Sequence, residues 1–181
     1  DVFGLLDVEF HLGALLTGRL TTWAGPDDPP PPIPQFDPAN FGPAPYGINN
    51  PFLPLVPGTT KVFEGETLEG LERIVVTVEE SRRVVLGIEC RVVVDRAYLD
   101  GELVEETYDW FAQDSAGNVW YFGEDSREIE DGMVVSTAGS WEAGVNGARP
   151  GYLMLAMPAV GASYRQEYYA GEAEDMAQVP A

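Results

Sequence analysis

Apolar and polar residues alternate along most of the chain after Thr59, with a period of two. This period is typical of β-strands that bury one face. It predicts strands at 59–66, 70–79, 84–99, 102–112, 118–123, 133–140 and 163–170. No helical pattern separates these runs, so we expect an all-β protein. Its antiparallel meander should form a curved sheet, a half-barrel or a barrel.

The turns between these runs carry their own signals. Asp100-Gly101 lies between two long alternating runs, and Asp131-Gly132 repeats the pattern. A two-residue type I′ hairpin turn needs positive φ at both central positions, which Asp-Gly tolerates well. Short turns of this kind join neighbouring antiparallel strands and support the meander.

Cys90 is the only cysteine, so the chain cannot form a disulfide within itself. It occurs in an alternating run whose core-facing members are predicted to be Leu86, Ile88, Cys90, Val92 and Val94. We therefore expect a buried structural thiol rather than a nucleophile or a metal ligand.

Composition divides the chain into three parts: an apolar strand segment at 1–24, a Pro-rich extended linker at 25–57 and an antiparallel β domain at 58–181. Dense prolines exclude helices and interrupt sheet pairing in the middle part. About 30 residues of linker at roughly 3.1 Å each would reach on the order of 90 Å. Aromatic residues between the prolines indicate that part of the linker lies on a surface.

The N-terminal segment carries an apolar face that needs a partner. The apolar residues at even-numbered positions would share one face of a strand, and we expect them to form an assembly surface. They are Val8, Phe10, Leu12, Leu16 and Leu20. The alternation favours a strand, whereas an amphipathic helix is the rival interpretation, weakened by glycines in the segment. Such a strand can pair within its own chain or with a sheet edge of a neighbouring copy.

The formal net charge of −20 changes which partners are plausible. A surface this negative repels nucleic acid and anionic lipid, so no nucleic-acid partner and no membrane insertion are expected. The chain opens at Asp1 without a methionine, which suggests a processed, exported product that is secreted or held at the cell surface. Other copies of the chain are the expected partners.

Aromatic and acidic residues gather in the predicted domain and support two alternative functions. A monomeric exported domain could bind a hydrophobic or saccharide ligand through the aromatic residues Trp110, Trp120, Trp141, Tyr164 and Tyr168. A glycosidase-like enzyme would need a carboxyl pair. The acidic residues beside these aromatics are Asp109, Glu124, Asp125, Glu142 and Glu167, and Glu124, Glu142 and Glu167 are the ones whose replacement would test such an activity. Aromatic cross-strand pairs in a curved sheet explain the same composition without a ligand.

No catalytic, cofactor or metal motif is recognised. The one histidine, His11, falls on the polar side of an alternating run, and no nucleophile elbow accompanies it. Carboxylates crowd the turns between Asp114 and Asp131, which raises the option of a structural calcium ion. No run has the ligand spacing of a helix-loop-helix calcium site, so a metal-free acidic surface is the simpler interpretation.

Several longer runs resemble a family of exported bacterial single-domain β proteins of unknown function, over roughly residues 50–179. The runs are NPFLPLVPGTT at 50–60, GNVWYFGED at 117–125, GSWEAG at 139–144 and YRQEYY at 164–169. The resemblance implies an exported β domain and transfers no catalytic residue. The N-terminal segment lies outside it.

Together these patterns predict a non-enzymatic extracellular structural protein. Its N-terminal strand is expected to be donated to a neighbouring subunit, so that copies assemble into a filament. The ligand-binding domain and the glycosidase-like enzyme remain the alternatives.

Overall fold

The computed structural model describes residues 29–42 and 47–179. Its elements, in chain order, are η2 (Pro38–Asn40), β1 (Ile48–Asn49), β2 (Pro54–Leu55), β3 (Thr60–Glu66), β4 (Leu71–Val85), β5 (Ile88–Leu99), β6 (Glu102–Gln113), β7 (Val119–Glu130), β8 (Met133–Ser136), β9 (Trp141–Glu142), β10 (Arg149–Met154), β11 (Ser163–Arg165), β12 (Glu167–Tyr168) and β13 (Met176–Gln178). Residues 1–24, including the assembly positions Val8, Phe10, Leu12, Leu16 and Leu20, lie outside the described residues.

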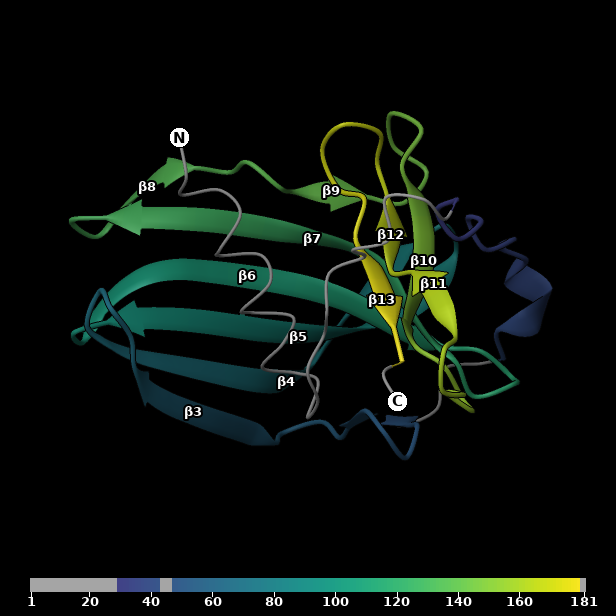
Figure 1. Ribbon diagram of the computed structural model, residues 1–181, viewed down its shortest axis with the longest axis horizontal. Helices are drawn as coiled ribbons and strands as arrows, with labels where there is room; N and C mark the ends of the chain where they lie inside the picture. The colour runs from purple at the N-terminus through teal and green to yellow at the C-terminus, as the bar shows by residue number, and fades with distance from the viewer. Residues whose placement is uncertain (1–28, 43–46, 180–181) are drawn as a thin grey trace.

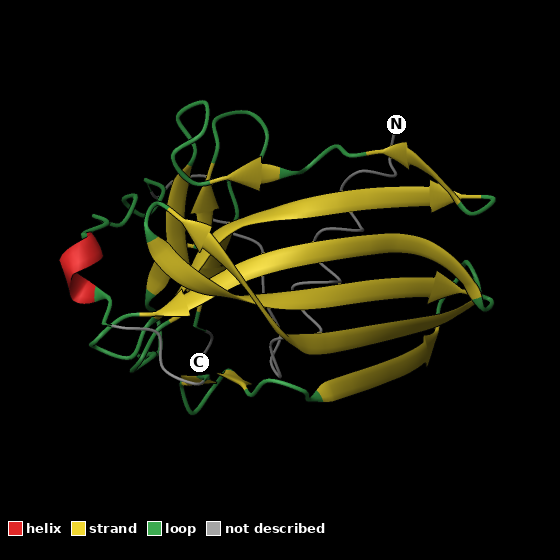
Figure 2. Ribbon diagram, turned by 180° about the vertical axis from the view of Figure 1, so that it is seen from behind, coloured by secondary structure: helices red, strands yellow, loops and turns green. Residues whose placement is uncertain are grey.

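The main sheet has nine strands and is antiparallel in every pairing described. Its path runs β12-β10-β7-β6-β5-β4-β3, and β8 and β9 pair with β7 beside this path. The long strands β3 to β7 form a meander that curls into a half-barrel, with the short C-terminal strands across one end (Figures 1 and 2). The predicted all-β, antiparallel, curved architecture is confirmed.

Both predicted Asp-Gly hairpins are confirmed. Asp100 and Gly101 have φ angles of 50° and 91°, and Asp131 and Gly132 have φ angles of 51° and 72°. These values lie in the left-handed region, as a type I′ turn requires at both central positions. The turns join β5 to β6 and β7 to β8.

The predicted strand at 84–99 is wrong at its start. Leu86 and Gly87 instead form the turn between β4 and β5, with φ angles of 50° and 80°. Leu86 is exposed, so it does not belong to the core face assigned to it. Gly87 takes up positive φ without steric cost, and the apolar alternation that continues across the turn hides it.

Four other strand boundaries differ from the sequence-based expectation. β4 continues to Val85 rather than ending near 79. β7 continues to Glu130 rather than ending near 123. Its second half is polar and carries no apolar alternation, so the sequence pattern does not predict it. β8 ends at Ser136, and the predicted strand at 163–170 is divided between β11 and β12.

The densest part of the core lies where the half-barrel meets the C-terminal strands. The largest fully buried side chains include Trp120, Tyr121, Phe111 and Phe122. The rings form two layers, one on each face of β7: Trp120 and Phe122 pack against Phe36 and Phe41, whereas Tyr121 packs against Phe111. Phe111 and Tyr121 have ring centroids 4.9 Å apart.

Cys90 is fully buried on β5, which confirms the expected structural thiol. Its Sγ lies 3.6 Å from the carbonyl oxygen of Ile88. Burial raises the pKa of the Cys90 thiol to about 12. The reactive thiolate form is therefore scarce at neutral pH.

We expect Cys90 to resist a thiol reagent in the native protein and to react fully after unfolding. Labelling at neutral pH, with and without denaturant and followed by intact-mass spectrometry, measures this. Rapid modification of the native protein would contradict the assigned burial.

The described part of the Pro-rich segment packs against the half-barrel. Phe36 and Phe41 place their rings edge-on to Trp120 and Phe122, with centroids 5.7–6.1 Å apart. The Nε of Arg165 donates a hydrogen bond of 3.0 Å to the carbonyl oxygen of Pro31. Residues 31–41 are thereby fixed on the domain.

The stretch just before β3 also belongs to the core. Leu53 and Leu55 are fully buried, and Ile48 on β1 is nearly so. Asn50 anchors this stretch, because its Nδ2 donates to the carbonyl oxygens of Gly117 and Leu155. Burial of three aliphatic side chains ties residues 48–55 to the domain that follows.

Candidate functional site

A group of buried polar side chains lies near the junction between the half-barrel and the C-terminal strands. It consists of Asp109 on β6, Tyr121 and Glu124 on β7, and Glu167 on β12. Asp109, Tyr121 and Glu167 are each at least 95% buried. We call these four residues the acid cluster.

Strand register brings the members of the acid cluster together. Asp109 is the direct neighbour of Glu124 in the pairing of β6 with β7, whereas Phe111 is the neighbour of Tyr121. The step from Asp109 to Phe111 on β6 is two residues, whereas the matching step from Tyr121 to Glu124 on β7 is three. β7 therefore contains a β-bulge between Tyr121 and Glu124. Residues three positions apart in a regular strand point to opposite faces, and the bulge turns Tyr121 and Glu124 toward the same face of the sheet.

Gly123 allows a third strand to approach at this bulge. Its φ angle is +133°, and a Cβ atom on it would lie 2.3 Å from the carbonyl oxygen of Trp141. A side chain larger than hydrogen would push β9 away from β7. Trp141 can therefore pair with Glu124 and pack its ring 5.2 Å from that of Tyr121.

Glu167 reaches the cluster through the C-terminal strands. It is the neighbour of Pro150 in the pairing of β12 with β10, and the next residue of β10, Gly151, is the neighbour of Tyr121. The Glu167 carboxyl group therefore lies on the side of the acid cluster opposite β6.

The hydrogen-bond geometry of Tyr121 requires an additional proton. Its phenolic oxygen lies 2.7 Å from Asp109 Oδ1 and 2.6 Å from Glu124 Oε2. A phenol has one proton to donate, so it can donate to only one of these two carboxyl groups. The other short contact needs a proton on the carboxyl group, and Glu124 is the residue best suited to hold it.

The electrostatic environment agrees with a protonated Glu124. Burial, followed by the negative charge of Asp109, raises the pKa of Glu124 from about 4.5 to about 8. Burial and the charge of Glu124 also raise the pKa of Glu167 well above its ordinary value, and the Trp141 side chain offsets part of this rise. Tyr121 has a raised pKa because it is buried among these carboxyl groups. The cluster therefore retains protons at neutral pH.

Holding protons in the interior is the chemistry that this arrangement supports. Glu124 and Glu167 are two of the carboxyl groups considered for a glycosidase, and the structure brings them into one cluster. The third, Glu142, instead forms an ion pair with Arg83, whose guanidinium lies 3.9 Å from the centre of the Trp110 ring. Among the described residues, no group of three or more His, Cys, Asp or Glu side chains is arranged to hold a metal ion.

The acidic turn considered for calcium uses its carboxylate internally. Asp114 Oδ1 accepts hydrogen bonds from the backbone N–H groups of Ala116 and Asn118. Asp114 Oδ2 accepts from Asn118 Nδ2 and from the indole N–H of Trp120. This carboxylate closes the β6–β7 turn and fixes the Trp120 ring.

The aromatic residues considered for ligand binding are largely in the core. Trp110, Trp120, Trp141 and Tyr164 are at least 92% buried. Tyr168 is half-buried, and the guanidinium of Arg165 lies 5.1 Å from its ring centre. Four of the five rings therefore stabilise the fold rather than line an open groove.

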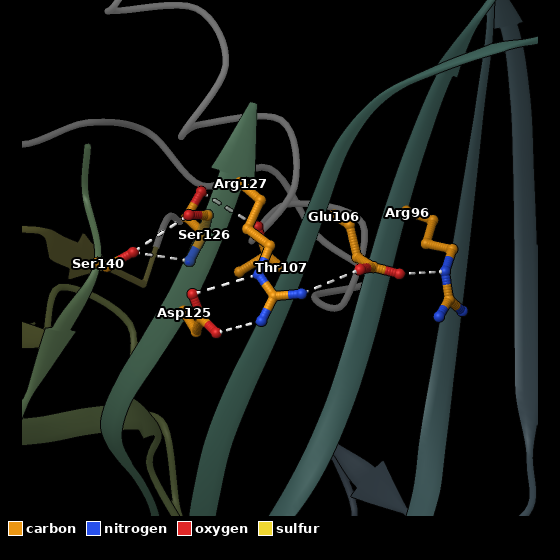
Figure 3. Close-up of polar contacts among 7 residues, drawn as sticks. All are labelled: Arg96, Glu106, Thr107, Asp125, Ser126, Arg127 and Ser140. Atoms are coloured by element: carbon orange, nitrogen blue, oxygen red, sulfur yellow. Dashed lines mark hydrogen bonds and ion pairs between the residues drawn. The ribbon is translucent and has the colours of Figure 1, made fainter. Parts of the chain in front are cut away.

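A ladder of charged side chains crosses β5, β6 and β7. Arg96 Nε donates to Glu106 Oε1 at 2.8 Å, and Arg127 bonds to Asp125 at 2.6 Å and lies 3.6 Å from Glu106 (Figure 3). These residues are partly exposed, so each pair stabilises the sheet by no more than about 1 kcal/mol. Opposite charges alternate along the ladder, which leaves no concentration of one sign.

A small cavity lies near β5. Its volume is about 30 Å³, and its lining includes Phe41, Ile88, Cys90 and Phe111. This is room for roughly one or two water molecules, well short of a sugar ring or a lipid chain.

Sequence reasoning found three of the four acid-cluster residues as candidates and missed Tyr121. Tyr121 reads as one aromatic among several in a strand, and only the bulge at Phe122-Gly123 turns it toward Glu124. Glycine inside a strand is a signal for such a bulge and could have indicated it.

In residues 29–42 and 47–179 no helix is long and apolar enough to cross a membrane. Comparison of the chain with protein-family models, curated proteins and solved structures found no match.

Proposed function

We propose that this chain is a non-enzymatic extracellular structural protein whose copies assemble by donation of the N-terminal strand to a neighbouring sheet. The observation that carries the proposal is the open half-barrel. Within the described residues, β3 pairs only with β4, and β8 pairs only with β7. Each edge therefore leaves a row of backbone N–H and C=O groups that an added strand can satisfy.

The packing of the domain supports assembly over ligand binding. A ligand groove would need exposed rings or a cavity of useful size, whereas four of the five candidate rings are buried and the cavity near β5 holds roughly one or two waters. The carboxyl groups of Asp109 and Glu167 are likewise buried and that of Glu124 is half-buried, which hinders the approach of a polysaccharide to the acid cluster. An open sheet edge is the feature that remains accessible.

The sequence supplies a matching donor. Val8, Phe10 and Leu12 alternate with polar residues, so one side of an added strand would bury apolar area. Each such side chain contributes roughly 1.5–3 kcal/mol when fully buried. Donor and acceptor surfaces differ, so the contact is heterologous and extends into an open chain of subunits.

The full-length protein is expected to form species heavier than its 19.7 kDa monomer at high concentration. The double change Phe10→Asp and Leu12→Asp should yield monomers with an intact fold, because charge on the apolar side removes the burial that favours donation. Size-exclusion chromatography with light scattering measures the mass, and circular dichroism checks the fold. An ionic strength of about 0.15 M or more screens repulsion between the acidic copies.

The matched control is His11→Asp with Thr17→Asp, which adds negative charge on the polar side of the same segment. This control should still assemble. A wild-type protein that remains a monodisperse monomer at high concentration would refute the proposal, as would equal loss of assembly in both double variants.

A further inference from the structure

The edge strand β8 exposes apolar side chains on both of its faces. Met133, Val134 and Val135 are 67%, 53% and 50% exposed, in consecutive positions of one strand. β8 pairs with β7 through Glu130↔Met133, Ile129↔Val134 and Glu128↔Ser136. No described residue pairs with its other side, so its backbone groups are available there.

The sequence around β8 lacks the devices that usually protect a sheet edge. Residues 132–140 contain no charged residue and no proline, although 22% of the chain is charged. Charged side chains and prolines on an edge normally prevent pairing with another strand. Apolar, β-branched and uncharged residues instead favour the addition of a strand.

The opposite edge of the sheet is protected. Lys61, the only lysine of the chain, lies on β3, together with Glu64 and Glu66. Glu64 forms an ion pair of 3.2 Å with Arg73 on β4. A strand that paired with β3 would have to pass between these charged side chains.

The β8 edge is also fixed in position. Beyond β8 the chain runs alongside β7 to β9 (Figure 1), and Ser140 holds this connection. The backbone N–H of Ser126 donates to Ser140 Oγ at 2.9 Å, and Ser140 Oγ donates to the carbonyl oxygen of Ser126 at 3.2 Å (Figure 3). An edge that is ordered before binding loses little conformational freedom when a strand is added.

From these observations we infer that β8 is the acceptor edge for the N-terminal strand of a second copy. This inference rests on the proposed function and specifies its partner surface. The donor presents Val8, Phe10 and Leu12, which alternate with polar residues over residues 7–12. Of the two edge strands β3 and β8, only β8 carries no charged side chain, so an apolar strand added there meets no charge on the strand it pairs with.

Charged substitutions on the two edges separate the acceptors. Val134→Lys with Val135→Lys should convert assembled protein to monomers, whereas Val62→Lys on β3 should leave the mass distribution unchanged. All three positions are at least 49% exposed in the subunit, so the fold itself should persist, as circular dichroism can verify. Loss of assembly through Val62→Lys alone would overturn the inference.

Cross-linking between chains provides a second readout that does not depend on lost assembly. A chain with His11→Cys is mixed with a chain carrying Val134→Cys or Val62→Cys, and a short bis-maleimide is added. The buried Cys90 should not react. We expect the mixed cross-link at position 134 to exceed that at position 62 by about tenfold or more, as for a site favoured in equilibrium.

The outcomes distinguish the choice of acceptor edge from strand donation itself. Assembled wild-type protein with preferential cross-linking at position 62 would refute the acceptor edge and leave strand donation standing. A monomeric wild-type protein without mixed cross-links at either position would refute donation itself.

Discussion

Replacing Trp120 with alanine is expected to lower the free energy of unfolding by about 3–5 kcal/mol, the usual range for a fully buried aromatic ring. Trp120 is 2% exposed. Its ring packs against Tyr152 with centroids 4.3 Å apart and receives Phe36 and Phe41 of the Pro-rich segment. Urea unfolding followed by far-ultraviolet circular dichroism measures the change.

The same substitution should also release the Pro-rich segment. Without the Trp120 ring, Phe36 and Phe41 lose one of the two aromatic partners that they share, so a protease should cut between residues 31 and 41 faster than in the wild type. Trp120→Phe is the matched control. It keeps most of the ring but loses the hydrogen bond to Asp114, so a smaller loss of about 1–2 kcal/mol is expected. A loss below about 1 kcal/mol for the alanine variant would contradict this role of Trp120.

The acid cluster predicts that the protein is less stable at pH 9 than at pH 5. Folding raises the pKa of Glu124 from about 4.5 to about 8. The folded state therefore binds this proton more tightly than the unfolded state. The stabilisation of the fold by this bound proton is complete below about pH 4.5, declines as the pH rises and is lost above about pH 8. The raised pKa of Glu167 acts in the same direction.

Glu124→Gln tests this dependence, because glutamine keeps the shape of the protonated carboxyl group and cannot ionise. We expect the variant to gain roughly 2–4 kcal/mol relative to the wild type at pH 9 and little at pH 5. Glu130→Gln, the same change at an exposed position of β7, serves as the control and should show no such difference. Urea midpoints at both pH values, with unchanged slopes, give the comparison. An equal effect of Glu124→Gln at both pH values would show that the proton is not held there.

The fold could be predicted from the sequence wherever local chemistry and the apolar pattern agree. The Asp100-Gly101 hairpin is an example, since both the turn residues and the flanking alternation indicate it. Leu86-Gly87 shows the opposite case, because leucine has no turn preference and the alternation runs across the turn. The second half of β7 was missed for a related reason. This part of the strand is set by pairing with β6 as far as Glu128 and with β8, not by a buried apolar face.

The candidate site could be predicted only in part. Asp109, Glu124 and Glu167 stand out as carboxyl groups beside aromatic residues, but the sequence does not show that they meet. Their meeting depends on the bulge in β7 and on the pairing of β12 with β10, both of which are tertiary features. The raised pKa values of Glu124 and Glu167 follow from burial, which a sequence pattern cannot measure. The N-terminal positions Val8, Phe10 and Leu12 stay a prediction.

In the proposed fibre, the hydrogen bond from Arg165 to Pro31 would set the spacing of the subunits. Because residues from Pro31 onward are held on the domain, the free connection to a donated strand begins at Pro31 instead of at the end of the Pro-rich segment. From Leu12, the last of the three donor residues, to Pro31 the chain can extend roughly 60 Å at most, at about 3.1 Å per residue, against roughly 140 Å if the connection ran to Pro57. Successive domains would then lie close together, and electron micrographs should show a fibre with a short, regular axial repeat rather than widely separated beads on a flexible string.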